Sequence, residues 1–194
     1  MDRATELDLV GRLRRGDPAA FDEVYAAYRA RLYSFLRRLT GRRELAEDLS
    51  QETWLRLADR AAGLREDTVL SAWLFTVARN LAASYWRSRW LDGPLTSSID
   101  DLDLPDDPAA SPERLAEARD ERRVLEASLA ALAATDREVL LLVGAEELSP
   151  AEAAAVCGLK PGTLRKRLER ARSRLAEVLD RLTTFPAEHE VNHA

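Results

Sequence analysis

The densest positive charge in the chain lies between Lys160 and Arg174, where seven Lys or Arg side chains accompany one acid, Glu169. A short apolar segment precedes it, bounded by Ser149 and Gly158. Cations on a helix can bind DNA phosphates, and an arginine can pair with a guanine edge in the major groove. A short helix, a tight turn and a basic second helix are typical of a helix-turn-helix. We therefore expect residues 148–175 to bind duplex DNA, although a helical hairpin with a solvated basic face has the same general pattern.

Local signals define both helices of this predicted motif. Ser149 is a good N-cap, Pro150 suits the first helical position, and Glu152 completes a capping box. Gly158 can adopt the left-handed conformation that ends a helix. One face of the second helix is expected to pack inward through residues at helical spacing, namely Leu164, Leu168, Ala171 and Leu175.

Two other patterns suggest metal chemistry, and we interpret neither as a metal site. Residues 189–193 read HEVNH, which matches the zinc-protease pattern H-E-x-x-H. That pattern works on a long buried helix with a third ligand elsewhere, whereas here it follows Pro186 and the chain has no other histidine. A second cluster consists of four carboxylates, Glu44, Glu47, Asp48 and Glu52. It lacks a histidine at suitable spacing and shares its surface with Arg42, Arg43 and Arg56, so a helical metalloenzyme is a weak alternative. We expect no catalytic residue, no metal and no cofactor.

The net charge of −5 hides strong local differences. Residues 91–112 hold six aspartates and no cation, whereas residues 160–174 carry a charge of +6. Phosphates respond to charge within about 10 Å, so the overall value does not exclude DNA binding. The single cysteine, Cys157, fits a reducing compartment and the role of a small buried hydrophobe. The chain shows no signal segment and no apolar run of about 20 residues, so we expect a cytoplasmic protein without membrane insertion.

The elements that must position these residues all have helical periodicity. Residues 1–16 predict a short helix, and the run from Phe21 to Leu39 has an apolar and aromatic stripe that we interpret as core. Residues 43–62 predict a third helix, and a loop over residues 64–70 leads to a fourth with Trp73 on a wide apolar arc. Residues 113–182 predict four more helices, including one that the capping-box pattern at Thr135 would open.

The end of the fourth predicted helix combines cations and aromatic rings. Tyr85, Trp86, Arg87 and Trp90 follow Arg79 and Asn80 closely. Rings can stack on unpaired bases while cations bind phosphate. The alternative is a core helix whose last turn is aromatic, and much of Trp73 and Trp86 is expected to be core.

The predicted fold class is therefore all-α, with two small helical domains joined by a flexible acidic linker. The N-terminal domain covers residues 1–90, the linker 91–112 and the helix-turn-helix domain 113–182, followed by a disordered tail over 183–194. The linker has four prolines and no helical period. Extended, it could span roughly 70 Å, so the two domains need not touch.

Three motifs in this order resemble the bacterial RNA polymerase sigma factors. Residues 48–56, DLSQETWLR, are similar to the D-x-x-Q-E-T/V-x-L-R signature of that family. AWL at 72–74 with ARN at 78–80 resembles its promoter-melting segment. GTLRKRL at 162–168 with AR at 171–172 resembles the recognition helix of the extracytoplasmic-function (ECF) subgroup. Arg165 and Lys166 stand where that pattern has Lys and Ser, and Ala153 replaces a larger aliphatic residue, departures that bear on the promoter sequence and not on the family.

The resemblance implies a sigma factor that binds core RNA polymerase and directs promoter-specific initiation, without enzymatic activity. The implied polymerase-binding residues are Asp48, Gln51, Glu52, Leu55 and Arg56. Those implied for the upstream promoter element are Lys160, Thr163, Arg165, Lys166, Arg167, Arg170, Arg172 and Arg174. Those implied for the melted downstream element are Trp73, Arg79, Asn80, Tyr85, Trp86, Arg87 and Trp90. Promoter DNA and core polymerase are the expected partners, an anti-sigma factor is a further one, and the chain is expected to be a monomer.

A freestanding helix-turn-helix regulator is the main alternative. It would share the C-terminal half and would bind duplex DNA alone, as a dimer on a palindrome. It leaves the signature at residues 48–56 and the Trp-rich fourth helix unexplained.

Overall fold

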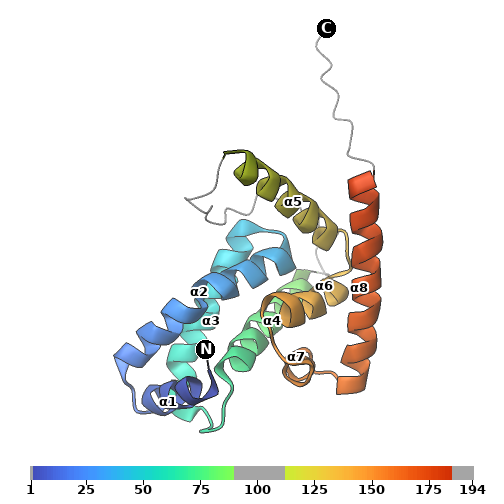
Figure 1. Ribbon diagram of the computed structural model, residues 1–194. Coiled ribbons are helices and arrows are strands. Elements are labelled where there is room, and N and C mark those ends of the chain that lie inside the picture. Colours follow the sequence, from blue (N-terminus) through green and yellow to red (C-terminus); the bar gives the residue numbers. More distant parts are fainter. Residues whose placement is uncertain (1, 90–111, 185–194) are drawn as a thin grey trace.

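The computed structural model describes residues 2–89 and 112–184, and every regular element in these two ranges is a helix. The N-terminal half contains α1 (Arg3–Arg14), α2 (Pro18–Thr40), α3 (Arg43–Arg60), η1 (Ala61–Gly63) and α4 (Leu70–Arg89). The C-terminal half contains α5 (Pro112–Ala130), α6 (Ala134–Leu140), η2 (Leu141–Ala145), α7 (Pro150–Cys157) and α8 (Pro161–Thr184) (Figure 1). The all-α prediction is confirmed. Trp90, the HEVNH pattern and the linker up to residue 111 lie outside the described residues.

The N-terminal half is built around α2, which packs against α1, α3 and α4. Asp17 caps α2 by accepting from the Ala19 amide, and Gly41 ends it in the left-handed conformation at φ 71°. Phe35 of α2 meets Phe75 of α4 edge to face at 5.2 Å between ring centroids, and both are fully buried. The predicted aromatic core of α2 is wrong at Tyr25, which is 42% exposed and lies edge-on to Trp54 of α3.

A buried carboxylate, Glu6, fastens α1 to the rest of this half. The Tyr28 hydroxyl donates a 2.8 Å hydrogen bond to Glu6, and Arg3 pairs with the same carboxylate at 3.3 Å. Burial, and then the bond to Glu6, raise the pKa of Tyr28 well above its usual range. The hydroxyl therefore remains a donor to the carboxylate at physiological pH.

In the C-terminal half, α6 begins differently from the prediction. The N-cap is Ala133, without a side-chain bond, so the capping box predicted at Thr135 is wrong. Its acids serve other contacts: Asp136 pairs with Arg174 of α8, and Glu138 pairs with Arg79 of α4. Leu125 of α5 lies at helical spacing from the buried Leu129 and Leu132, yet it is 40% exposed. The helix α8 continues to Thr184, two residues beyond the predicted end of this domain.

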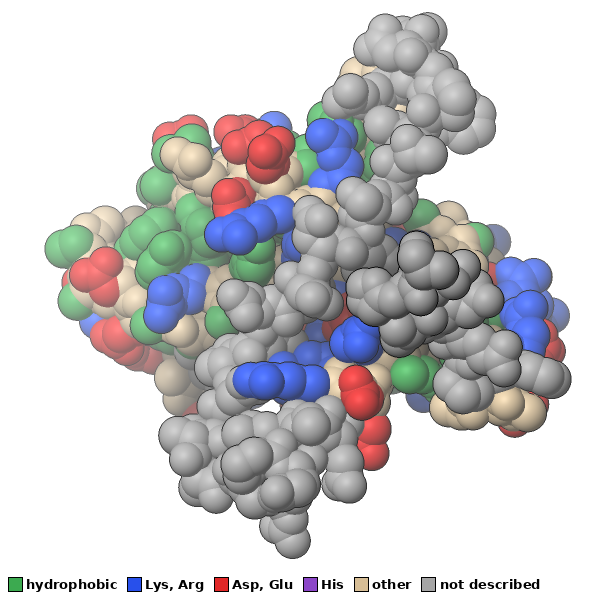
Figure 2. All heavy atoms as spheres, turned by 90° about the horizontal axis from the view of Figure 1, so that it is seen from above, with side chains coloured by type: hydrophobic (Ala, Val, Ile, Leu, Met, Phe, Trp, Pro, Cys, Tyr) green, Lys and Arg blue, Asp and Glu red, His purple; other side chains and the backbone are tan. Residues whose placement is uncertain are grey.

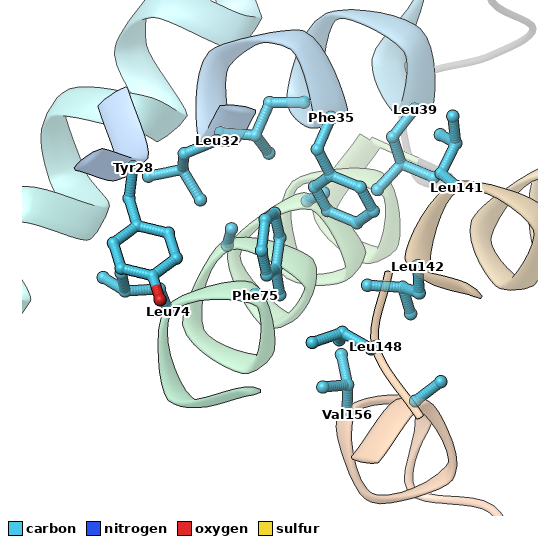
Figure 3. Packing of buried hydrophobic residues seen from close by; sticks show 14 of the residues in the cluster. Tyr28, Leu32, Phe35, Leu39, Leu74, Phe75, Leu141, Leu142, Leu148 and Val156 are labelled. Carbon is cyan, nitrogen blue, oxygen red and sulfur yellow. The ribbon is translucent and has the colours of Figure 1, made fainter. Parts of the chain in front are cut away.

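The two halves share one hydrophobic core. Helix α7 lies against α4, and α2 contacts both α5 and α6. Leu141 and Leu142 of η2, with Leu148 and Val156, belong to the same buried cluster as Phe35 and Phe75. Figure 3 shows Leu39 of α2 and Leu141 of η2 meeting at one end of this cluster. The sequence allows the two halves to stay apart, but in this structure they pack against each other. Among the described helices, none is long and apolar enough to span a membrane.

Candidate functional site

Helices α7 and α8 form the predicted helix-turn-helix, and its turn follows the local signals closely. Ser149 accepts from the Glu152 amide and Glu152 reaches back to the Ser149 amide, which completes the capping box. Gly158 has φ 65°, and the Gly158 and Leu159 amides donate to the carbonyls of Ala155 and Ala154. This Schellman arrangement ends α7 and lets Pro161 open α8 after a three-residue turn. The turn sets the direction of α8 relative to α7.

The first turns of α8 present an uninterrupted cationic face. Thr163, Arg165 and Lys166 are exposed, and Arg167 is half-buried above the inward residues Leu164 and Leu168. The other predicted contacts, Lys160, Arg170 and Arg172, are exposed too. Within the described part of the chain, no ion pair neutralises the cations between Lys160 and Arg172. Figure 2 shows Lys and Arg side chains gathered along the right-hand edge, the side on which Figure 1 places α8. This face can meet DNA phosphates without first breaking an internal ion pair.

Two positions of α8 depart from the simple picture of a charged helix face. Arg174 pairs with the buried carboxylate of Asp136, so this cation ties α8 to α6 instead of standing free. Gly162, in the first turn, has no structural need for glycine, because an added Cβ would meet no atom within 4 Å. A bare backbone at that point suits close approach of a ligand to the start of α8.

Apart from Trp90, which lies outside the described residues, the residues predicted to hold a melted strand lie on α4, in different environments. Arg79 is paired with Glu138 at 2.7 Å, and the Arg42 guanidinium donates to the Tyr85 hydroxyl at 2.7 Å. Asn80 and Arg87 are exposed. Trp73 and Trp86 are partly buried against the core, as the sequence predicts. The structure thus brings Asn80 and Arg87 to the surface and holds Arg79 in an internal bond.

The loop over residues 64–70, which leads into α4, is anchored at several points. Leu64 and Leu70 are buried, while Arg65, Glu66 and Asp67 are exposed. The Arg3 guanidinium donates to the carbonyls of Asp67 and Thr68 at 2.7 and 3.1 Å. The loop is therefore held by α1, which the sequence does not reveal.

The predicted polymerase-binding residues share one face of α3. Asp48 and Gln51 are exposed, and Leu55 is the most exposed of the large hydrophobic residues described, at 54%. Glu52 and Arg56 pair with each other at 2.9 Å, one helical turn apart. The structure thus places an exposed leucine beside an amide, acids and an arginine on one face of α3.

The described residues contain no group of three or more His, Cys, Asp or Glu side chains placed to hold a metal ion. Cys157 is buried, as predicted, and burial raises the pKa of its thiol to about 12. Sequence reasoning missed Glu126, Glu138 and Glu146, three C-terminal carboxylates that pair with arginines of the N-terminal half. Their spacing carries no signal, because each partner is at least 59 residues away in the chain.

Comparisons with known proteins agree on what this arrangement resembles. Residues 24–91 match Sigma-70 region 2, and residues 122–175 match Sigma-70 region 4. The ECF RNA polymerase sigma factor EcfG of Rhodopseudomonas palustris is 35% identical over 158 residues, covering 81% of this chain and 83% of that protein. The sigma factor SigM of Bacillus subtilis is 32% identical over 162 residues, covering 82% of this chain and 95% of SigM. Among solved structures, the sigma factor RpoE of Bartonella quintana in complex with the anti-sigma factor NepR is 30% identical, with a TM-score of 0.68 over 82% of this chain and 96% of that one.

Proposed function

The chain belongs to the ECF RNA polymerase sigma factors and directs transcription initiation, and we propose that it does so by dividing the work among three surfaces. The face of α3 would bind core polymerase, α8 would read the upstream promoter element, and α4 would hold the opened downstream element. No surface performs bond chemistry, since the polymerase supplies the catalytic centre.

The observation that carries this proposal is the separation of the two exposed surfaces. The α3 face, with Asp48, Gln51 and Leu55, and the α8 face, with Arg165 and Lys166, lie on different halves, and both are open to solvent. A protein that bound DNA alone would have no use for the first surface. A protein that bound only another protein would have no use for the second. The two together suit an adaptor between polymerase and DNA.

On α8, the proposed readers of base edges are Thr163, Arg165, Lys166 and Arg167, because they lie in the first turns of a recognition helix. An arginine paired with a guanine contributes roughly 1–3 kcal/mol of discrimination. Arg170 and Arg172, farther along the helix, are proposed to bind phosphates, which orient the protein without reading sequence. Arg174 is a weaker candidate for a phosphate contact, since Asp136 already engages it.

On α4, Asn80 and Arg87 are proposed to contact the unpaired strand first. Both are exposed, and the half-buried Tyr85 and Trp86 lie beside Arg87 in sequence with rings on which a base can stack. Arg79 would join them only after its bond to Glu138 is exchanged for a phosphate. We also propose an anti-sigma factor as a partner, on the strength of the structural relative RpoE, whose solved structure contains one.

The test is binding and footprinting with purified components. The chain should form a stable complex with core polymerase, and that complex should protect a promoter at two separated sites. The double variant Arg165→Ala/Lys166→Ala should lose protection of the upstream site and keep core binding. Loss of core binding in that variant, or protection of a palindrome by the chain alone, would contradict the assignment of surfaces.

A further inference from the structure

We propose that a pocket between α1 and the segment that follows α3 binds a small phosphorylated ligand, about the size of a mononucleotide, through Arg14 and Arg15. None of the residues that line this pocket belongs to the three surfaces assigned above. The inference therefore goes beyond the proposed function. The ligand is a free small molecule and not a segment of promoter DNA.

The pocket has a volume of about 470 Å³. One wall consists of residues of α1 at helical spacing, and the other consists of η1 and the loop after it. The lining residues are Leu7, Gly11, Arg14, Arg15, Ala62 and Glu66. Pockets that hold small molecules typically have volumes of about 300–1,000 Å³, so this one has room for more than a simple ion.

The guanidinium group of Arg14 has donors that the protein itself leaves unused. Its Nη1 donates a 2.6 Å hydrogen bond to Glu66 Oε1. Its Nε is buried without a hydrogen-bond partner, and no other buried side-chain nitrogen or oxygen in the described residues shares this condition. A buried donor without a partner has lost its hydration and gained nothing in return. The edge formed by Nε and Nη2 can donate to two oxygens of one phosphate, so an oxyanion there would satisfy this donor.

Arg15 supplies a second cation, and no ion pair joins it to another residue of the described chain. Its guanidinium lies back along α1, with Nη1 3.5 Å from the place that a Cβ on Gly11 would occupy. Glycine inside a helix is destabilising relative to alanine, and here a Cβ would fit. The missing side chain of Gly11 instead leaves space for a ligand beside Arg15.

Glu66 is a replaceable counter-ion for this site. Its side chain is 84% exposed, and water and salt weaken an ion pair made by so exposed a carboxylate. The loop does not depend on this pair alone, because Arg3 donates to the carbonyls of Asp67 and Thr68. A phosphate with two negative charges can therefore replace the Glu66 carboxylate on Arg14 while the loop stays anchored.

The rest of the lining indicates the class of ligand. Leu7 and Ala62 are both exposed and form an apolar surface beside the two guanidinium groups. A molecule with a phosphate at one end and a flat organic group at the other, such as a nucleoside monophosphate, matches this division. A continuous DNA strand matches it poorly, because the phosphates on either side would face the displaced Glu66 carboxylate.

The test is an NMR titration of the full chain labelled with ¹⁵N, in which the Nε–H signal of Arg14 reports on the pocket. The probes are AMP, GMP, CMP and UMP, with adenosine, inorganic phosphate and a 12-nucleotide single-stranded DNA in separate arms. Arg14→Gln removes the fork of donors, and Gly11→Leu fills the pocket while leaving both cations in place. Arg29→Gln is the matched control, because Arg29 is exposed on α2 and lines no part of the pocket. Circular dichroism checks that each variant keeps its helices.

We expect at least one monophosphate to shift the Arg14 signal and to bind at least tenfold more tightly than adenosine or inorganic phosphate. Arg14→Gln and Gly11→Leu should each weaken this binding roughly tenfold or more, since a hydrogen bond to a charged group is lost or blocked, and Arg29→Gln should not change it. Three results would each overturn the proposal: no response to any monophosphate, equal binding by inorganic phosphate, or tighter binding of the single-stranded DNA at this site. Unchanged affinity in either pocket variant would overturn it as well. The titration contains neither polymerase nor promoter, so its outcome is independent of the proposed function.

Discussion

Replacing Leu55 by alanine should weaken binding to core polymerase without affecting the fold. Leu55 is 54% exposed, so its outer half stabilises nothing within the described chain. Burying a whole leucine side chain is worth about 1.5–3 kcal/mol, so covering the exposed half at an interface is worth about 0.8–1.6 kcal/mol. Alanine keeps one methyl group, which leaves a loss of about 1 kcal/mol, or roughly fivefold in Kd.

The assay is a fluorescence titration of labelled protein with core polymerase, accompanied by thermal unfolding of each variant. Leu7→Ala is a matched control, since Leu7 is 40% exposed on α1 and lies outside the proposed polymerase and DNA surfaces. The control should bind as the original chain does. If Leu55→Ala binds core as tightly as Leu7→Ala while both remain folded, the assignment of the α3 face is refuted.

Three further predictions concern single residues. Gly162→Ala should raise the stability of α8 by about 0.5–1 kcal/mol, because alanine is the better helix former and the added Cβ meets no other atom. The same variant should reduce promoter binding by the holoenzyme in a mobility-shift assay. Equal promoter binding would show that DNA does not approach this backbone. Cys157 should resist alkylation at pH 7–8 in the folded chain and react on denaturation, because burial raises its pKa to about 12; rapid labelling of the folded protein would contradict this environment. Glu146→Gln should unfold at a higher temperature than the original chain near neutral pH. Desolvation raises the pKa of Glu146, so its ionisation costs stability as pH rises through that raised value. The unfolding temperatures of the two proteins should become equal below the ordinary glutamate pKa, and a variant that is less stable at neutral pH would contradict the prediction.

Helix ends were predicted well where the signal is local. Ser149 with Glu152, and Gly158, act within three or four residues of themselves, and each is found in its expected role. Their effect depends on backbone geometry that the same few residues determine. The same reasoning failed at Thr135, because the acids that follow it are bonded to distant arginines instead of to the helix start.

Surface and core were harder to separate along α2 and α5. Tyr25 and Leu125 occupy positions that helical spacing assigns to the inner face, yet both are about two-fifths exposed. Periodicity gives the direction of a side chain around its helix but not how far the neighbouring helix extends to cover it. The sequence likewise gives no sign that α7 packs on α4, because that contact joins residues on either side of the predicted linker.

The exposed residues of the candidate site could be placed from the sequence, whereas the residue held by an internal bond could not. The cations of α8 and the face of α3 project into solvent, so their identity and helical phase were sufficient to place them. The environment of Arg79 was not predictable, since the residue that engages it, Glu138, lies 59 positions away on another helix. Pairing of this kind depends on the tertiary arrangement, and no local pattern encodes it.

Run-off transcription with purified core polymerase on a pool of genomic promoter fragments tests the central claim most directly. Core alone should give no specific transcripts, and core with added protein should give discrete transcripts from a small set of fragments that share two separated sequence elements. The absence of specific transcripts, from a core preparation that another sigma factor activates, would contradict the account.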